Sequence, residues 1–498
     1  MQSVKNGFDN DKYLLLQSEN IRERISKFGG KLYLEFGGKI FDDFHASRVL
    51  PGFEPDSKVR MLTQLKDQAE IVIVINSGDI EKNKVRGDTG VTYDLEALKM
   101  IDTLRGRGFL VSGVVLTQYN SQHAADKFRD RLIALGMKVY KHYLIAGYPS
   151  NIPHIVSENG FGKNDHVITE RSLVVITGPG SGSGKMATCL SQLYHDHKNG
   201  IKAGYAKYET FPMWDLSLKH PVNLAYEAAT ADLNDVNMID PFHLEAYGKS
   251  ATSYNRDIAI FPVLCAMMEK ISGTPPYKSP TDMGVNKAGK CIVDENVVKQ
   301  ASRQEIIRRY YAAKCAVKEG FGSEGPVLKL EILMKKAGVS TDDRKVAVQV
   351  MRMAADTGRA VVGIELHDGR IVTGKSSPLM CSSAAMLLNT LKTIAKLDDS
   401  IPLISPSVIE PVREMKTKYM GNTSPRLHAD EILVALSVSA AMSPAADVAF
   451  KRLPDIRGCE AHSSVILASV DEQVFRKLGV NITCEPQYQT ADLYQGFR

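Results

Sequence analysis

A run of glycines that ends in a lysine is the feature of this sequence whose residue types point most directly to chemistry. The segment GPGSGSGK follows the apolar run LVVIT and precedes the helical pattern MATCLSQLYHDH. Glycines allow successive backbone N–H groups to face one anion, and the helix that follows adds free N–H groups and the positive end of its dipole. We therefore predict a phosphate or nucleotide site, with a flexible connector as the alternative. Its binding residues would be Gly178, Gly180, Ser181, Gly182, Ser183, Gly184 and Lys185.

This glycine segment departs from the nucleotide-hydrolase pattern G-x-x-x-x-G-K-[ST] at two positions. Pro179 stands where the first glycine belongs, although Gly178 is one place earlier. Met186 replaces the hydroxyl residue that ligates Mg²⁺, and Thr188 lies about 200° farther around a helix axis. We expect ATP, another nucleotide or a phosphorylated small molecule to bind, while the sequence leaves Mg²⁺ and hydrolysis undecided.

A literal match to the same pattern occurs at residues 369–376, GRIVTGKS. Its middle residues include Ile371 and Val372, which are β-branched and favour a strand. The apolar run VVGIEL, the turn residues HDG and the second β-rich run RIVTGK together predict a β-hairpin instead.

Three other polar side chains are candidates for contact with a second substrate. His45 lies in the charged segment EFGGKIFDDFHASRVLPGF, which follows a predicted strand. Arg86 follows the strand IVIVI and could bind an anionic group through two parallel hydrogen bonds. Asp282 lies in a long loop, residues 272–290, that could cover a phosphate site. We name His45, Arg86 and Asp282 as catalytic candidates, although ordinary solvated loops would have the same composition.

No metal site is expected from the sequence. The acids between Glu227 and Asp240, together with His243, could hold a metal, but their spacing fits the wet face of a helix better. The patterns H-E-x-x-H, C-x-x-C and G-x-S-x-G are absent, so neither a zinc peptidase nor a serine hydrolase is supported.

Short β-rich runs that alternate with helical patterns must position these residues. Such alternation occurs before residue 145 and again between Leu173 and Tyr208, and it predicts mostly parallel sheets covered by helices. The expected fold is α/β, with two Rossmann-like or P-loop-like parallel-sheet units and a smaller C-terminal unit. Segments rich in Pro, Gly and Asn near residues 148–166 and 320–326 indicate the boundaries. They give a Rossmann-like domain at 1–160, a P-loop-like domain with a helical extension at 161–325 and an α+β domain at 326–498.

Composition sets limits on the partners. The chain has 498 residues, 44% of them hydrophobic and 24% charged, and a net charge of +5, which is too small to indicate nucleic-acid binding without a clustered basic face. Seven cysteines without a C-x-x-C pair and a start that is not a signal peptide favour a reducing, cytoplasmic location without a membrane partner. The nearest approach to a membrane span, residues 432–450, contains Pro444 and Asp447 and predicts a buried helix followed by another. The sequence leaves undecided whether the protein forms a homo-oligomer.

Four segments carry a resemblance to a known family: EFGGKIFDDFHASRVLPGF, ITGPGSGSGKMATCLSQLYHD, YKSPTDMGVN and HADEILVALSVSAA. Together they resemble a bacterial family catalogued as domain of unknown function 1846, and the resemblance covers nearly the whole chain. Members have been labelled ATP-dependent peptidases, a label that the residues of this sequence do not support. The resemblance carries over no catalytic residue.

The residues thus predict a phosphate- or nucleotide-binding protein that is an enzyme of transferase or ligase type, acting in a cleft between the first two domains. Two alternatives stay open: a non-enzymatic sensor of nucleotides or phosphometabolites, and a glycosyltransferase-like enzyme with two nucleotide-fold domains. A catalyst should bury titratable groups with perturbed pKa values in the cleft between the first two domains, whereas a sensor needs only the phosphate loop and a mobile element.

Overall fold

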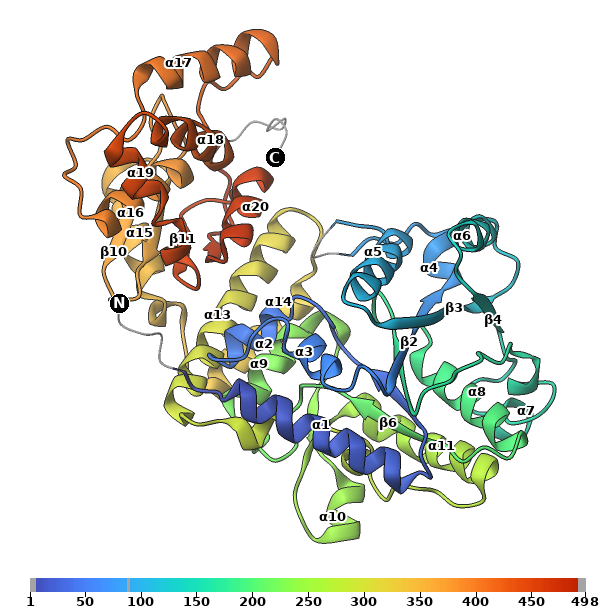
Figure 1. The fold of residues 1–498 in the computed structure, drawn as a ribbon. Helices are drawn as coiled ribbons and strands as arrows, with labels where there is room; N and C mark the ends of the chain where they lie inside the picture. The colour runs from blue at the N-terminus through green and yellow to red at the C-terminus, as the bar shows by residue number, and fades with distance from the viewer. Residues whose placement is uncertain (1–5, 87–89, 491–498) are drawn as a thin grey trace. The chain divides into compact units, whose positions relative to one another are not determined.

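The computed structural model describes residues 6–86 and 90–490, and these form two compact units (Figure 1). We refer to residues 6–302 as the N-terminal unit and to residues 303–490 as the C-terminal unit, and we describe each by itself.

A six-stranded sheet, in which every neighbouring pair is parallel, is the framework of the N-terminal unit. Its strands are β1 (Leu32–Phe36), β2 (Ala69–Asn76), β3 (Leu110–Tyr119), β4 (Val139–Tyr143), β5 (Leu173–Thr177) and β6 (Gly204–Tyr208), in the order β4-β3-β2-β5-β1-β6. The central strands β2 and β5 are apolar and buried along nearly their whole length, as expected for strands covered on both faces. A small antiparallel pair, β7 (Asn237–Ile239) and β8 (Thr252–Tyr254), lies outside this sheet.

Helices cover the sheet of the N-terminal unit. They are α1 (Asn10–Lys27), α2 (Phe44–Val49), α3 (Ser57–Thr63), α4 (Ser77–Glu81), α5 (Tyr93–Gly106), α6 (His123–Ala134), α7 (Ile152–Ile155), α8 (Lys185–Lys198), α9 (Pro221–Ala229), α10 (Pro241–Tyr247), α11 (Asn255–Ser272), α12 (Pro280–Met283) and the start of α13 (Glu295–Lys318). One face of the sheet, including Tyr33, Val174 and Tyr205, packs against α8 and α11 through side chains such as Leu190 and Phe261. Elsewhere, α5 packs against β2 and β3, and α1 packs against α3 (Figure 1).

The expectation of two parallel-sheet units within the first 325 residues is corrected by this topology. β5 follows the expected boundary at residue 160, yet it pairs with both β1 and β2, so the strands on the two sides of that boundary form one sheet. The sequence could not distinguish these cases, because a βαβ pattern reads the same whether its strands extend an existing sheet or begin another. The compact unit that contains this sheet ends at Ser302.

A smaller mixed sheet, with the order β10-β9-β11-β12, forms the centre of the C-terminal unit. Its strands are β9 (Val361–Glu365), β10 (Ile371–Lys375), β11 (Glu460–Ser463) and β12 (Asn481–Cys484); its helices, after the end of α13, are α14 (Glu324–Ala337), α15 (Lys345–Thr357), α16 (Ser382–Ala395), α17 (Pro406–Glu414), α18 (Ala429–Ala440), α19 (Pro444–Phe450) and α20 (Ser469–Leu478). β9 and β10 form an antiparallel pair, so the predicted hairpin at the literal phosphate-loop match is confirmed. β11, α20 and β12 form a parallel β-α-β unit.

A buried ion network joins the helices of the C-terminal unit to its sheet. Arg344, only 1% exposed, contacts Glu460 Oε2 through Nη1 at 2.6 Å and donates from Nη2 to the carbonyl oxygen of Ala461 at 2.6 Å. Arg308 on α13 contacts Glu460 Oε1 at 2.6 Å. Burial raises the pKa of Glu460, but the two guanidinium groups outweigh this effect and hold the pKa below its usual range.

None of the helices in the described part of the chain has the length and apolar character needed to cross a bilayer. The segment at residues 432–450 is divided between α18 and α19, with Pro444 as the first residue of the second helix, as the sequence predicts.

Candidate functional site

The glycine segment leaves β5 at the position in the sheet where the chain changes its direction of travel. β2 and β5 are neighbours, but the chain leads from β2 to β3 on one side and from β5 across β1 to β6 on the other. Helices following the two strands therefore diverge, and open parallel sheets bind ligands in the crevice that this divergence creates. Residues 178–184, which we call the glycine loop, lie at this point.

The packing of the glycine loop requires residues without side chains. Gly182 and Gly184 have φ values of +74° and +89°, in the left-handed region. A Cβ on Gly184 would lie 2.9 Å from Thr117 Cγ2, and a Cβ on Gly178 would collide with the carbonyl oxygen of Val74. A Cβ on Gly180 would likewise collide with the Tyr93 hydroxyl. The alternating glycines thus fit the loop closely against β2, β3 and the start of α5.

The backbone N–H groups of the glycine loop are available to a ligand. In the described part of the chain, the N–H groups from Gly180 to Ala187 donate to no carbonyl or side-chain acceptor, and the helical bonding of α8 begins with Thr188 N–H to the carbonyl of Gly184. The polar groups that are satisfied belong to the loop's own framework: Ser183 Oγ donates to the Gly180 carbonyl at 2.7 Å, and Thr117 Oγ1 donates to the Ser183 carbonyl at 2.7 Å. The loop therefore combines a fixed shape with several free donors.

Lys185 folds back over the glycine loop from the first position of α8. Its Nζ donates to the carbonyl oxygen of Gly180 at 3.1 Å, a contact that an anion in the loop would replace with a stronger, charge-assisted one. Burial lowers the pKa of Lys185, while the carboxylates of Glu35 and Glu209 oppose this shift. Two carboxyl groups therefore lie close enough for their charges to act on the Lys185 ammonium.

These carboxyl groups belong to a polar cluster on the face of the sheet that α8 and α11 cover. Glu35 and Lys207 are directly paired positions of β1 and β6. Tyr205, two residues before Lys207 and hence on the same face, donates to Glu35 Oε2 at 2.6 Å. Lys207 Nζ contacts Asp257 Oδ1 at 2.6 Å and Glu209 Oε1 at 3.1 Å.

Gly37 makes room for the Glu209 side chain, because a Cβ at this position would lie 2.6 Å from Glu209 Cγ. Tyr254 donates from its hydroxyl to Glu209 Oε2 and accepts from Lys207 Nζ at 2.9 Å. We call Glu35, Lys207, Glu209, Tyr254 and Asp257 the carboxylate–lysine cluster.

The carboxylate–lysine cluster contains a carboxyl group that titrates near neutrality. The pKa of Glu209 is raised to about 7. Burial is the main cause and the Asp257 charge adds to it, while Lys207 acts in the opposite direction. The pKa of Lys207 is raised well above its usual value, because Asp257, Glu209 and Glu35 outweigh the effect of its burial. Lys207 is therefore a fixed cation, whereas Glu209 is suited to gain and lose a proton at physiological pH.

Comparison with known proteins agrees with the resemblance seen in the sequence. Residues 6–338 match the family described as "Domain of unknown function DUF1846, N-terminal", and residues 342–494 match "Domain of unknown function DUF1846, C-terminal". The chain belongs to the DUF1846 family.

Close relatives of this DUF1846 chain occur in several bacteria. The UPF0371 protein of Corynebacterium efficiens is 54% identical over 493 residues, covering 99% of this chain and 100% of the relative. A UPF0371 protein of Streptococcus pyogenes serotype M5 is 54% identical over 488 residues, and one of Streptococcus thermophilus is 53% identical over 491 residues. These two comparisons cover 98% and 99% of this chain, respectively, and 99% of each relative.

Two of the hydroxyl groups of the DUF1846 chain near the glycine loop, those of Thr188 and Ser183, do not replace the missing magnesium ligand. Thr188 is fully buried beside His142, with 3.5 Å between Oγ1 and Nδ1, and Ser183 donates within the loop itself. Met186 packs at the edge of the apolar cluster beneath α8. Ser181 is exposed at the tip of the loop.

The three catalytic candidates occupy different places in the DUF1846 fold. His45 on α2 borders the cluster through aromatic rings, because it packs edge-on against Phe211, which stacks on Tyr226. Arg86 lies in the segment between α4 and α5, and its Nη1 is held by Glu96 Oε1 at 2.7 Å. Asp282 accepts from the Tyr247 hydroxyl at 2.7 Å, and none of its contacts among the described residues reaches the glycine loop.

The carboxylate–lysine cluster was missed in the sequence. Its only signal was the alternation in AGYAKYE, which places Tyr205, Lys207 and Glu209 on one face of a strand. That signal has meaning only when β6 is known to lie beside β1, because Glu35 must face the same side. The acids considered as metal ligands serve structural roles instead: Asp240 caps α10 and binds Thr281, and Asp235 pairs with Arg256.

Proposed function

We propose that this protein binds the phosphate group of a nucleotide or phosphorylated small molecule in the glycine loop, and that it is an enzyme of transferase or ligase type. The observation that carries the proposal is the row of N–H groups from Gly180 to Ala187, which have no acceptor among residues 6–86 and 90–490 and lie under Lys185 at the divergence of β2 and β5. Such donors stabilise phosphate charge without reorganisation, and Lys185 adds a positive charge.

The carboxylate–lysine cluster supports an enzyme rather than a sensor. A sensor needs only a binding loop and an element that responds, whereas proton transfer needs a group with a pKa near the working pH. Glu209, with a pKa of about 7, meets that need and lies close enough to Lys185 to act on its charge. In its ionised form Glu209 would accept a proton from the hydroxyl or amine of a second substrate as that group attacks the bound phosphate compound; the bond to the leaving group then breaks, and the leaving group departs with the electron pair.

The expected place of the reaction changes with the fold. A cleft between two parallel-sheet domains has no counterpart within residues 6–302, because all six parallel strands form one sheet. We place the reaction at the carboxyl ends of β5, β1 and β6 instead. The glycosyltransferase-like alternative loses its basis for the same reason, since it presupposes two facing nucleotide-fold domains.

Lys185 keeps the phosphate-binding role predicted for it, and Glu209 takes the catalytic role for which Arg86 and Asp282 were candidates. Arg86 is engaged by Glu96 and Asp282 by Tyr247, so neither is assigned to the chemistry. His45 stays a candidate for contact with the second substrate. The exposed hydroxyl of Ser181 and the carboxylates of Glu35 and Glu209 are the groups that could ligate Mg²⁺ near the loop, because the hydroxyl groups of Ser183 and Thr188 are engaged elsewhere.

A thermal-shift screen tests the proposal. Nucleotides and phosphorylated metabolites are added to the full chain, with and without Mg²⁺, and the melting of wild type is compared with that of Lys185→Ala. A ligand present at 100 times its Kd should stabilise wild type by about 2.7 kcal/mol. Loss of the charge-assisted contact in Lys185→Ala should weaken binding about tenfold to a hundredfold.

Lys202→Ala is the matched control, because Lys202 is an exposed lysine beyond the other end of α8. It should respond to ligands as wild type does. The proposal is wrong if no phosphate compound shifts wild type, or if Lys185→Ala and Lys202→Ala respond alike. An enzyme is separated from a sensor by turnover: the ligand that binds should be converted when candidate acceptors are added, and Glu209→Gln should bind it but convert it more slowly.

We also propose a cytoplasmic location. Support comes from the cysteines, all seven of which are free thiols even though several lie at partly exposed positions.

A further inference from the structure

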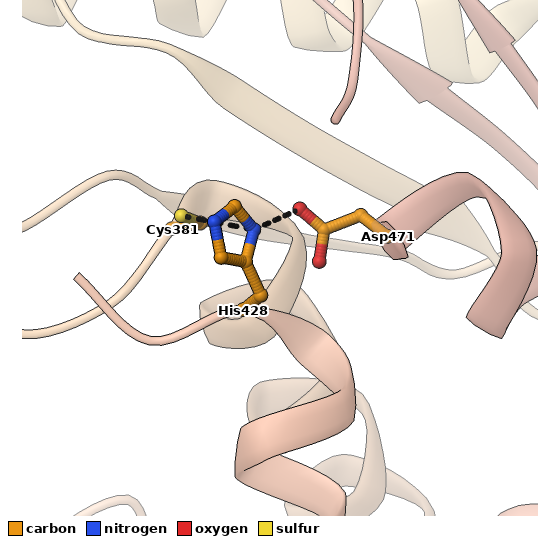
Figure 2. A group of neighbouring side chains, drawn as sticks. All are labelled: Cys381, His428 and Asp471. Carbon is orange, nitrogen blue, oxygen red and sulfur yellow. Dashed lines mark hydrogen bonds and ion pairs between the residues drawn. The ribbon is translucent and has the colours of Figure 1, made fainter. Parts of the chain in front are cut away.

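The C-terminal unit brings together three side chains that the sequence analysis did not connect. Cys381 directly precedes α16, His428 directly precedes α18, and Asp471 lies in the first turn of α20 (Figure 2). Their separations along the chain, 47 residues between Cys381 and His428 and 43 between His428 and Asp471, match no metal-binding pattern.

One imidazole nitrogen is the centre of this group. Nδ1 of His428 lies 2.9 Å from Asp471 Oδ2 and 3.7 Å from Cys381 Sγ, and one donor atom from each residue lies within 4.8 Å of the others (Figure 2). Asp471 is buried, while Cys381 is partly buried and the His428 side chain is 24% exposed. The three donors are thus accessible to a small ion.

The arrangement differs from that of a thiol nucleophile with a general base. In such an enzyme one ring nitrogen faces the nucleophile and the carboxylate holds the other. Here the thiol and the carboxylate both approach Nδ1, so the ring cannot relay a proton from one to the other through its two nitrogens. Figure 2 shows the ring between the thiol and the carboxylate, and donor atoms of the three residues lie within 4.8 Å of one another, which is close enough for them to share one small ion.

We propose that Cys381 Sγ, His428 Nδ1 and Asp471 Oδ2 bind a divalent cation of the zinc class, with a fourth position left for water. Thiolate and imidazole ligands favour zinc-like ions over Mg²⁺ or Ca²⁺. Tetrahedral zinc with bonds of about 2.0–2.3 Å places its ligand atoms roughly 3.3–3.8 Å apart. The Cys381–His428 distance already falls in this range, and the His428–Asp471 hydrogen bond must lengthen by a few tenths of an ångström.

The surrounding backbone holds the three ligands in place. Cys381 N–H donates to the carbonyl of Leu427 at 2.9 Å, and Leu427 N–H donates to the carbonyl of Leu379 at 3.0 Å, so the segments that carry two of the ligands are paired. The second oxygen of Asp471 accepts from Ala429 N–H at 2.8 Å, which fixes the carboxylate. Supporting contacts of this kind orient ligands in established metal sites.

Metal binding by the full chain tests the site directly. Protein stripped with a chelator is loaded with Zn²⁺ or Co²⁺, freed of excess ion by gel filtration and assayed for metal. One tightly bound ion per chain is expected in wild type, and the Co²⁺ form should show a thiolate-to-cobalt charge-transfer band. Cys381→Ser should abolish the band, and Asp471→Asn should release most of the ion, whereas Cys265→Ser, which removes a partly exposed thiol of the N-terminal unit, should retain both.

Both substitutions in the cluster keep the local hydrogen bonding, because serine is a good helix N-cap and asparagine still accepts from Ala429 N–H. Circular dichroism checks that the variants fold. Alkylation of Cys381 by iodoacetamide, followed by mass spectrometry of its peptide, provides a readout in unmodified protein: Zn²⁺ should protect this thiol. The proposal is overturned if wild type retains no ion, if the charge-transfer band survives in Cys381→Ser, or if Cys381 reacts equally fast with and without Zn²⁺.

Discussion

The Glu209 carboxyl differs from a surface carboxyl group because burial raises its pKa. Its pKa of about 7 is above the usual value of 4.5, so the folded protein binds a proton there more tightly than the unfolded chain does. The stability that this proton provides is fully present below pH 4.5 and is lost as the pH rises through 7. Lys207 cannot remove the effect, because Asp257 engages the same ammonium group.

Glu209→Gln should therefore gain stability relative to wild type as the pH rises from 5 to 8, by at most about 3 kcal/mol. Chemical unfolding at several pH values measures the difference. Glu158→Gln is the control. Glu158 is exposed and pairs with Lys198, and this contact lowers the pKa of the Glu158 carboxyl, so that Glu158 stays ionised over this range. A constant difference between Glu209→Gln and wild type at all pH values would contradict the raised pKa.

At the scale of elements, the glycine loop depends on two separate properties of glycine. Gly184 needs the left-handed conformation, and it also needs space beside Thr117. Gly200, which follows the other end of α8, has a φ of +75° but open space around its missing Cβ. Comparing Gly184 with Gly200, at the two ends of α8, therefore distinguishes the effect of backbone strain from the effect of steric contact.

Gly200→Ala should cost about 1 kcal/mol from the positive φ alone, whereas Gly184→Ala should cost more and should also displace the loop from its N–H geometry. Equilibrium unfolding gives the two free energies, and the phosphate compound found in the ligand screen gives the two affinities. Equal stability losses with unchanged affinity in both variants would show that the contact with Thr117 does not shape the loop.

The elements themselves were largely predictable, but their neighbours were not. LYLEF, LVVIT and IVIVI were predicted as strands from their apolar runs alone, and the structure confirms them. The glycine loop followed from local composition in the same way. Glu35 and Lys207 could not be connected, because their contact depends on β1 lying beside β6, and parallel pairing leaves no trace in either local segment. The proximity of Cys381 and His428 could not be predicted either, because it also depends on contacts between segments that are distant in the sequence.

For the whole molecule, the division into two units means that each has its own core and its own stabilising polar groups. The buried network around Glu460 belongs entirely to the C-terminal unit. Removing its negative charge leaves Arg308 and Arg344 with less compensation, although Glu305 still contacts Arg308 at 2.8 Å.

Glu460→Gln should destabilise the C-terminal unit by about 3–5 kcal/mol, the typical cost of breaking a buried ion pair. Hydrogen exchange should rise in β9, β11 and β12 while exchange in β1, β2 and β5 stays unchanged. Asp368→Asn removes an exposed carboxylate that pairs with Arg370 in the hairpin, and it should have little effect on stability because the pair is fully solvated. Equal exchange increases in both sheets would contradict this localisation.

The position of β1 has a consequence for how the chain acquires its structure. Leu32 pairs with Leu173 on one side and with Gly204 on the other, so β1 has no sheet partner until the chain has been made as far as β5. During synthesis the apolar segment of β1, LYLEF, therefore stays unpaired while β2, β3 and β4 can already associate. Pairing of such distant segments is slow and exposes strand edges in the meantime. The step that brings Glu35 beside Lys207, insertion of β1 between β5 and β6, is thus also the step at which we expect the nascent chain to depend most on chaperones.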